Sequence, residues 1–292
     1  MDLALWECAK LWPSSTQPDV VLSLGTGTED NLKSPKAPNF RHLLNDGFIP
    51  RLCRSFMSSL DGERTWRNIA NRLDESTKAD YFRLNVPWTG EEPRLDDVEC
   101  IDTLRRLVQL QPQGSRDRTR IASALLVASF YFKLNEIPTF QTGQYLCTGM
   151  IRCRNDFRAV SSSLLRIHNT QLELTTDTES LGLLTSDDIC EQCHVYCKTV
   201  QFHVRYLEDV VTLFVKINGL ERRKISGFPH SMSWFSRQQH LDAPFGRIDH
   251  DLESLTKCRA CTSYQDHRIE MRTTRKRKRQ CSEASRKRVK RG

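Results

Sequence analysis

The sequence lacks any apolar run long enough to cross a bilayer. Its longest nearly uncharged apolar stretch, Ile121–Phe132, falls well short of the roughly 20 residues of a transmembrane helix and indicates a buried strand instead. The N-terminus has no basic region followed by an apolar one, so we expect no secretory signal. These absences predict a cytoplasmic protein, in which an odd number of cysteines, 11, favours free thiols over a disulfide framework.

Acidic residues are nearly absent from the end of the chain. From Arg272 to Gly292 there are 11 basic residues and a single acidic one, Glu283, which gives this segment a net charge of +10. Because the whole chain carries +8, the remainder carries −2. The basicity therefore belongs to the tail, and the isoelectric point alone is no argument for nucleic-acid binding.

The basic residues of the tail form two separated blocks, a spacing that suits a bipartite nuclear import signal read by an import carrier. The alternatives are a solvated, disordered tail without a dedicated partner and contact with an anionic membrane surface. No aromatic residue follows Tyr264, so base stacking in the tail is not expected, and no specific nucleic-acid motif is present. The residues of the candidate import signal are Arg275, Lys276, Arg277, Lys278, Arg279, Arg286, Lys287, Arg288, Lys290 and Arg291.

The first 30 residues have the pattern of an α/β unit. Leu5, Cys8 and Trp12 share one helical face, and Pro13 ends that helix. The apolar run Asp19–Leu24 is bounded by turn residues, which is typical of a strand buried in a parallel sheet. One helix and one strand cannot form a sheet, so we expect the strand's partners to be missing or to come from elsewhere.

The rest of the chain alternates between helical and strand patterns. Helices are expected at Phe40–Asn45, Arg51–Leu60, Thr65–Leu73, Asp96–Leu110, Phe157–Ile167 and Ser231–His240. Ser115–Arg120 is expected to be a polar connector. Strands are expected at Ala124–Leu134, Gln144–Arg152 and Val200–Leu207, with Val210–Ile217 as the hairpin partner of the last.

This pattern predicts four segments. They are a hydrolase-like remnant at 1–30, a helical region at 31–117, a mixed α/β accessory region at 118–252 and a disordered basic tail at 253–292.

Several of these stretches resemble the fungal branch of the patatin-like phospholipases. The resemblance begins with the helix and strand that end in Ser-Leu-Gly-Thr-Gly, and it extends over most of residues 2–250. The stretches that carry it are Leu3–Glu7, Asp19–Gly27, Phe56–Glu63, Tyr81–Asn85, Ile151–Arg154, Ile225–Pro229 and Ser231–Phe235.

The resemblance implies an acyl ester hydrolase with a three-layer α/β/α domain, acting on lipid at a membrane surface. In that family a serine on a G-x-S-x-G turn attacks the ester, and an aspartate in a D-G-[GA] loop is its base. This chain has no G-x-S-x-G, and Asp46 and Asp61, its only Asp-Gly aspartates, follow the Gly25–Gly27 strand end instead of preceding its helix. We therefore expect a fragment of such a hydrolase with no catalytic residues, inactive alone. The alternative is a non-catalytic interaction module with a nuclear-targeting tail.

Two further motifs each allow a functional and a structural interpretation. Gly25-Thr26-Gly27 lacks the third glycine of a dinucleotide fingerprint, which favours a structural turn over phosphate binding, and we expect no cofactor. Cys190-x2-Cys193-His194 matches the spelling of haem attachment, which requires an export context that is absent here. With Cys258-x2-Cys261 it could instead close a zinc site, although the gap of 64 residues is long and ordinary reduced cysteines are the main interpretation.

Overall fold

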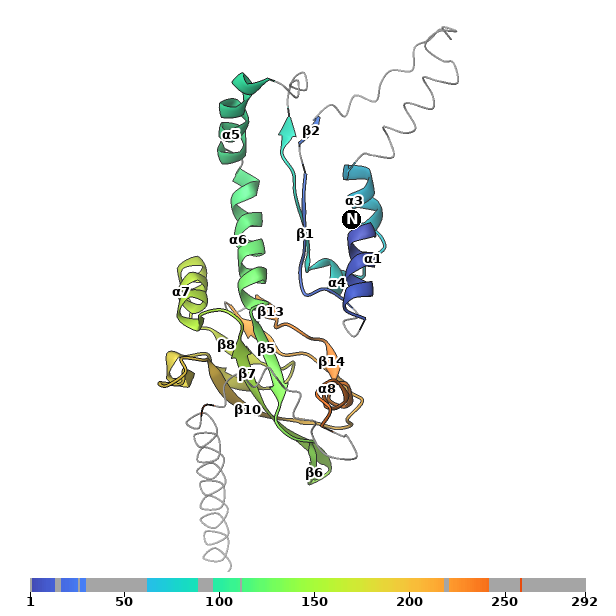
Figure 1. The fold of residues 1–292 in the computed structure, drawn as a ribbon, viewed down its shortest axis with the longest axis vertical. Helices are drawn as coiled ribbons and strands as arrows, with labels where there is room; N and C mark the ends of the chain where they lie inside the picture. Colours follow the sequence, from blue (N-terminus) through green and yellow to red (C-terminus); the bar gives the residue numbers. More distant parts are fainter. Residues whose placement is uncertain are drawn as a thin grey trace, which may run out of the picture. The chain divides into compact units, whose positions relative to one another are not determined.

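The chain is a mixed α/β protein that forms two compact units (Figure 1). The computed structural model describes residues 2–13, 17–25, 27–29, 62–88, 97–110, 112–217, 221–241 and 258. The first unit is Met1–Leu125 and the second is Leu126–Gly292, a division that falls inside one helix. The helices expected at Phe40–Asn45 and Arg51–Leu60 lie outside the described residues, and the four predicted segments remain a prediction.

Two short parallel pairings organise the first unit. Helix α1 (Asp2–Leu11) precedes strand β1 (Val21–Leu24), which pairs in parallel with β3 (Tyr81–Leu84) from Val21↔Tyr81 to Leu24↔Leu84. Directly after them, β2 (Thr28–Glu29) pairs in parallel with β4 (Pro87–Trp88). The expected helix and strand at the N-terminus are confirmed, and the strand has a partner that the sequence pattern did not reveal.

Five helical segments accompany these strands. They are α3 (Gly62–Ala70), α4 (Glu75–Lys78), the 3-10 turn η1 (Val98–Cys100), α5 (Ile101–Leu110) and α6 (Pro112–Val127). Asp74 caps α4, because its side chain accepts a hydrogen bond from Thr77 N. The buried core of this unit is small: Phe82 packs with Ile121 and Ala124 of α6, and Val20 and Leu84 lie against them.

Antiparallel sheets form the second unit. One has the order β10-β7-β5, built from β5 (Phe130–Leu134), β7 (Gln144–Cys153) and β10 (Cys197–Val204), with β6 (Thr139–Gln141) paired to β7. The other has the order β13-β12-β8-β9, built from β8 (Glu173–Thr175), β9 (Ser180–Leu183), β12 (Phe214–Lys216) and β13 (Arg222–Lys224). A short pair joins β11 (Val210–Val211) to β14 (His230–Ser231).

Helices α7 and α8 and the turn η2 complete this unit. Helix α7 (Phe157–His168) starts at Asp156, which accepts from Arg158 N, and ends at Asn169 in the left-handed conformation. It buries Phe157, Val160 and Leu164, one face at helical spacing. Helix α8 (Met232–Gln238) is capped by Ser231, and η2 covers Ser186–Asp188.

One large core fills the second unit. Phe132 of β5 lies at its centre, with ring contacts to Phe202, Phe228 and Phe235 at centroid distances of 5.8, 6.0 and 5.3 Å. Such tilted and edge-on pairs add to the area that aromatic rings bury. A unit with this core has the apolar burial that an independently folding domain needs.

Three sequence expectations for residues 115–217 are wrong. Residues from Ile121 to Val127 and from Ser115 to Arg120 are helical, because α6 runs through both and turns Ile121 and Ala124 toward Phe82. The strand expected at Val200–Leu207 is present as β10 (Cys197–Val204). It pairs with β7 and not with residues 210–217. The latter segment divides into β11 and β12, whose partners are β14, β8 and β13. No helix among the described residues is long and apolar enough to cross a membrane.

Candidate functional site

A polar network joins the carboxyl ends of the parallel strands to α3. Glu63 Oε1 accepts from Arg83 Nε at 2.9 Å and from Arg83 Nη2 at 2.7 Å, and it also accepts from Asn85 Nδ2. Arg83 Nη1 donates to Ser23 Oγ at 2.8 Å. Because the side chains of this ion pair are 14% and 26% exposed, the pair is only partly screened by solvent. The network therefore fixes α3 against β1 and β3.

Two glycines allow the chain to turn at this strand end. A Cβ at Gly25 would lie 2.3 Å from Cγ and Oδ1 of Asn85, so only glycine fits. Gly27 has φ +117°, and its N–H donates to Asn85 Oδ1 at 2.8 Å. Asn85 also accepts from Val86 N at 3.1 Å. The turn is thus held by hydrogen bonds to the side chain of Asn85, the residue that directly follows β3.

This strand end has the chemistry of a structural turn. The N–H of Gly27 already donates to Asn85 Oδ1, so this donor is not available to a phosphate. Ser23 Oγ accepts from a guanidinium, whereas a nucleophilic serine needs a base beside it. The network was not predicted from the sequence, although Arg83 and Asn85 lie in a stretch that carries the family resemblance.

The second candidate site lies in the loop between η2 and β10. The chain turns back at Cys190–Val195, where Cys190 N donates to Val195 O at 3.1 Å and His194 N donates to Cys190 O at 2.9 Å. His194 has φ +57°, the left-handed conformation that reverses the chain just after Cys193. An antiparallel bridge between Ile189 and Tyr196 closes the base of the loop. We call residues 190–195 the cysteine loop.

Buried groups anchor both ends of the cysteine loop. Asp188 Oδ2 and Lys198 Nζ lie 3.4 Å apart, with side chains 3% and 12% exposed. Tyr196 stacks on Phe157 with a centroid distance of 3.9 Å and an interplanar angle of 2°. Both ends of the loop are therefore attached to the core of the second unit.

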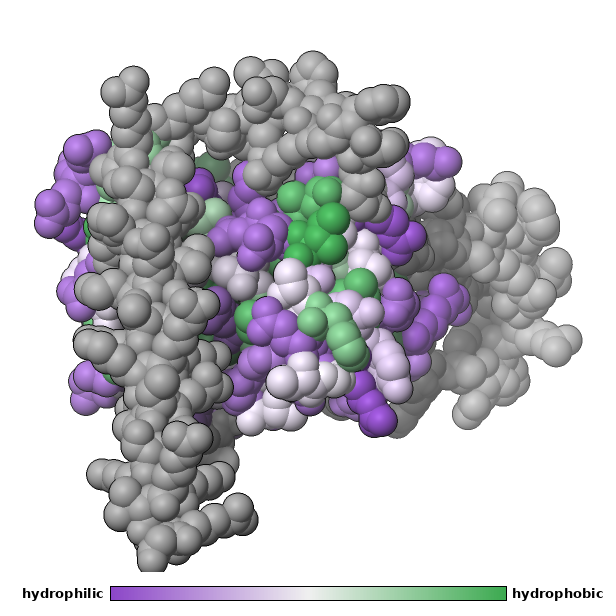
Figure 2. Space-filling view, turned by 90° about the horizontal axis from the view of Figure 1, so that it is seen from below, coloured by the Kyte–Doolittle hydropathy of each residue, from purple (hydrophilic) through white to green (hydrophobic). Residues whose placement is uncertain are grey.

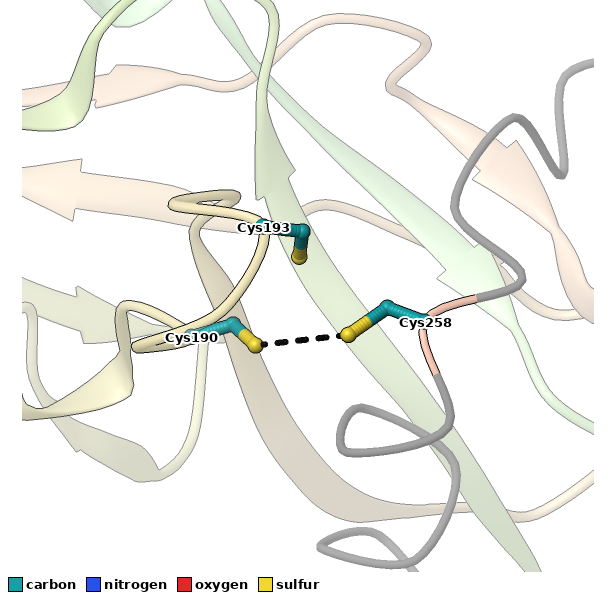
Figure 3. A group of neighbouring side chains, drawn as sticks. All are labelled: Cys190, Cys193 and Cys258. Atoms are coloured by element: carbon teal, nitrogen blue, oxygen red, sulfur yellow. Dashed lines mark hydrogen bonds between the residues drawn. The ribbon is translucent and has the colours of Figure 1, made fainter.

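Three cysteines converge beside this loop (Figure 3). Cys190 and Cys193 come from the loop, and Cys258 comes from a point 68 positions after Cys190. The Sγ atoms of Cys190 and Cys258 lie 3.8 Å apart, and all three Sγ atoms lie within 4.8 Å of one another. All three residues are half-buried. Cys258 Sγ also donates to Gln192 Oε1 at 3.6 Å.

The structure thus brings together three of the four cysteines that the sequence singled out. Cys261 lies outside the described residues, as do Asp46, Asp61 and every residue of the candidate import signal from Arg275 to Arg291. Cys197 belongs to a different contact, because its Sγ lies 3.2 Å from Met150 Sδ. The sequence allowed a common zinc site for the two Cys-x2-Cys pairs, with their 64-residue gap as the objection, and the tertiary fold brings Cys190 and Cys258 together across that gap.

A pocket of about 270 Å³ lies between α7 and the segment that runs from β9 to η2. It is lined by Phe157, Ser161, Leu165, Gln171, Leu172, Leu183, Leu184, Thr185 and Ser186. None of these side chains is a carboxylate, histidine, lysine or cysteine, so the lining offers no general base for its two serines. The pocket can hold a small apolar group but has no catalytic chemistry of its own.

Comparison with known proteins found no match for the chain among family models, curated proteins or solved structures.

Proposed function

We propose that residues 2–88 form part of the α/β layer of a patatin-like acyl ester hydrolase. The single observation that carries this proposal is the parallel pairing of β1 with β3, with a tight glycine turn at their carboxyl ends. Parallel strands are a property of α/β proteins with helix-covered sheets. Substrate sites of such proteins lie outside the carboxyl ends of the strands, which is where the Gly25–Gly27 turn lies.

The exposure of the first unit's apolar residues supports the same proposal. Leu22 and Leu24 of β1 are 38% and 69% exposed, and Trp6 of α1 is 56% exposed. A two-stranded sheet is marginal in water, and buried parallel strands are apolar on both faces. The pattern is that of a layer whose further strands and helices would complete a three-layer domain.

The proposal assigns no catalytic residue to this chain. The sequence has no G-x-S-x-G and no D-G-[GA] ahead of the helix–strand pair, so neither the nucleophile nor its base can be assigned. The 292-residue chain alone is inactive toward esters. In a complete hydrolase, the unit would contribute to a site that acts on acyl esters of a lipid surface.

A second candidate is a non-catalytic interaction module built on the second unit. It is favoured by the core of that unit, which is complete among the described residues and needs no further strand. On the face drawn in Figure 2, however, hydrophobic side chains form small groups among hydrophilic ones and no broad apolar surface. Such a module would bind through polar contacts or through the basic tail and an import carrier.

The test uses two proteins. The first is the 292-residue chain, assayed with a short-chain nitrophenyl ester, a phospholipid vesicle and a fluorophosphonate probe. We expect no turnover and no labelled serine. The second is the product of the reading frame extended through the coding DNA directly upstream, for which we expect both missing motifs, ester turnover and one labelled serine.

Variants in the extended protein connect activity to this chain. Asn85→Ala removes the acceptor for Gly27 N and the bond to Glu63, and we expect turnover to fall at least about tenfold because the strand end shifts. Lys78→Ala, which removes only an exposed ion pair with Glu75, should leave turnover unchanged. An upstream sequence without either motif would refute the hydrolase proposal and leave the interaction module. Turnover with one labelled serine in the 292-residue chain would instead mean that a nucleophile outside the family's motif is present, and it would contradict the assignment of no catalytic residue to this chain.

A further inference from the structure

We propose that Cys190, Cys193 and Cys258 bind a zinc ion as thiolates and that this ion links Cys258 to the cysteine loop. The cysteine loop supplies two ligands at Cys-x2-Cys spacing, which is the usual spacing of structural zinc sites. The inference is independent of the hydrolase proposal, since it concerns other residues in the other unit.

The sulfur separations fit a tetrahedral zinc ion. With Zn–S bonds of about 2.3 Å and tetrahedral angles, two ligating sulfurs lie about 3.8 Å apart. The Sγ atoms of Cys190 and Cys258 are 3.8 Å apart. A disulfide would need about 2.05 Å between the same atoms, so these sulfurs are placed for a shared ion and not for a bond to each other.

Contacts that involve no cysteine sulfur hold the shape of the cysteine loop. Its two backbone hydrogen bonds and the left-handed His194 turn Cys190 and Cys193 toward one space, as Figure 3 shows. The Asp188–Lys198 pair and the Tyr196–Phe157 stack hold the ends of the loop on the core. A preorganised pair of ligands lowers the entropic cost of binding the metal.

The third ligand argues against chance proximity. Cys258 lies 68 positions after Cys190 and 17 after Leu241, the last described residue before it. Bringing it back to the cysteine loop costs the closure entropy of that stretch, which a single contact of thiols does not offset. A zinc–thiolate site does offset it, because its binding energy contributes directly to folding. The metal would therefore act as a cross-link between two parts of the chain that are distant in sequence.

Cys261, which completes the second Cys-x2-Cys pair of the sequence, lies outside the described residues. Cys197 is excluded by its contact with Met150. On binding, each thiol gives its proton to solvent and its sulfur to zinc, and no oxidation state changes. Four thiolates make a closed, structural site, whereas three and a water would leave an open position. Soft sulfur ligands favour zinc over magnesium or calcium.

The experiment measures metal content and geometry in the full chain, purified under reducing conditions without a chelator. Elemental analysis should find about one zinc per chain. After exchange, cobalt should give the intense d–d bands of tetrahedral geometry and thiolate charge-transfer bands.

Serine variants distinguish the cysteines that bind zinc from those that do not. Cys190→Ser, Cys193→Ser and Cys258→Ser should each lower zinc content and weaken zinc affinity at least about tenfold. Cys197→Ser, close to the site, and Cys8→Ser, exposed in the first unit, should keep one zinc. Far-ultraviolet circular dichroism identifies any variant that fails to fold. For such a variant, alkylation of the folded wild-type chain with and without zinc, read by peptide mass spectrometry, shows whether the ion protects that thiol.

Three results would overturn the proposal. One is a reduced, folded chain that holds no zinc and gives no tetrahedral cobalt spectrum. The other is a Cys190–Cys258 disulfide, found by mass spectrometry of peptides from chain prepared without reductant, that forms in preference to metal binding when zinc is present. Loss of zinc from Cys8→Ser or Cys197→Ser equal to that from Cys258→Ser would also contradict it.

Discussion

At the scale of single residues, burial decides which cysteines react. Cys147 lies in the core of the second unit with no exposed surface, and burial raises the pKa of its thiol to about 12. Cys8 is exposed on α1. Because the thiolate is the nucleophile, we expect iodoacetamide at pH 8 to modify Cys8 in minutes and Cys147 only after unfolding in urea. Peptide mass spectrometry checks this, and equal labelling rates in the native chain would contradict it.

The glycine turn gives a second prediction at this scale. Gly25→Ala would place a Cβ 2.3 Å from Asn85, so that the side chain must move and release Gly27 N. We expect a loss of about 2–3 kcal/mol in the stability of the first unit, measured by urea unfolding with hydrogen exchange on β1 and β3. The control is Gly62→Ala, whose Cβ meets only the flexible end of Arg83 at 3.2 Å. A cost of less than about 0.5 kcal/mol is expected for that control.

At the scale of elements, β14 and α8 are sensitive to acid through His230. The ring of His230 stacks on Trp234 at 3.8 Å, and burial, followed by the charge of Lys224, lowers its pKa from 6.5. A lowered pKa means that the folded state binds fewer protons than the unfolded state. Stability is therefore full above pH 6.5 and decreases as the pH falls through the folded pKa.

Hydrogen exchange of α8 measures this effect. We expect protection of its amides to fall between pH 7.5 and 5, after correction for intrinsic exchange. The variant His230→Phe keeps a stacked ring without a titrating group, so its α8 should lose less protection over the same range. If wild type and variant respond equally, His230 is not the responsible group.

The elements also show where sequence patterns succeed. The helix expected at Phe157–Ile167 and the strand expected at Gln144–Arg152 agree with α7 and β7 to within one residue at each end. In α7 the apolar residues Phe157, Val160 and Leu164 recur at helical spacing, the kind of pattern that a sequence shows directly. The run from Ile121 to Phe132 was assigned to one strand because a continuous apolar stretch has no period to read. Its first part is helical, since Ile121 and Ala124 have Phe82 to pack against. Neither the pairing of β1 with β3 nor that of β10 with β7 is encoded locally.

The cysteine site was likewise only partly predictable from local sequence patterns. The two Cys-x2-Cys pairs were visible in the sequence, but their gap of 64 residues argued against a common site. The fold removes that objection, because the cysteine loop is anchored on the core and Cys258 returns to it. Sequence reasoning can thus identify ligands of the right chemistry, while their convergence is a property of the tertiary structure.

At the scale of the whole molecule, the two units differ in how much apolar surface they bury. The second unit has a continuous core that includes Phe130, Phe132 and Phe202, whereas Phe82, Ile121 and Ala124 form the buried cluster of the first. Each ordered residue costs about 1–2 kcal/mol of conformational entropy, and apolar burial is the main term that offsets it. We therefore expect the described strands of the first unit to be less stable than those of the second.

Native-state hydrogen exchange should resolve this difference within one sample. We expect amides of β7 and β10 to exchange at least about a hundredfold more slowly than those of β1 and β3, because the former open only when the large core unfolds. In the extended protein proposed above, further strands would cover Leu22 and Leu24, and protection of β1 should rise toward that of β7. Equal protection of both units in the 292-residue chain would mean that they unfold as one cooperative domain, and it would remove the argument that the first unit is an incomplete layer.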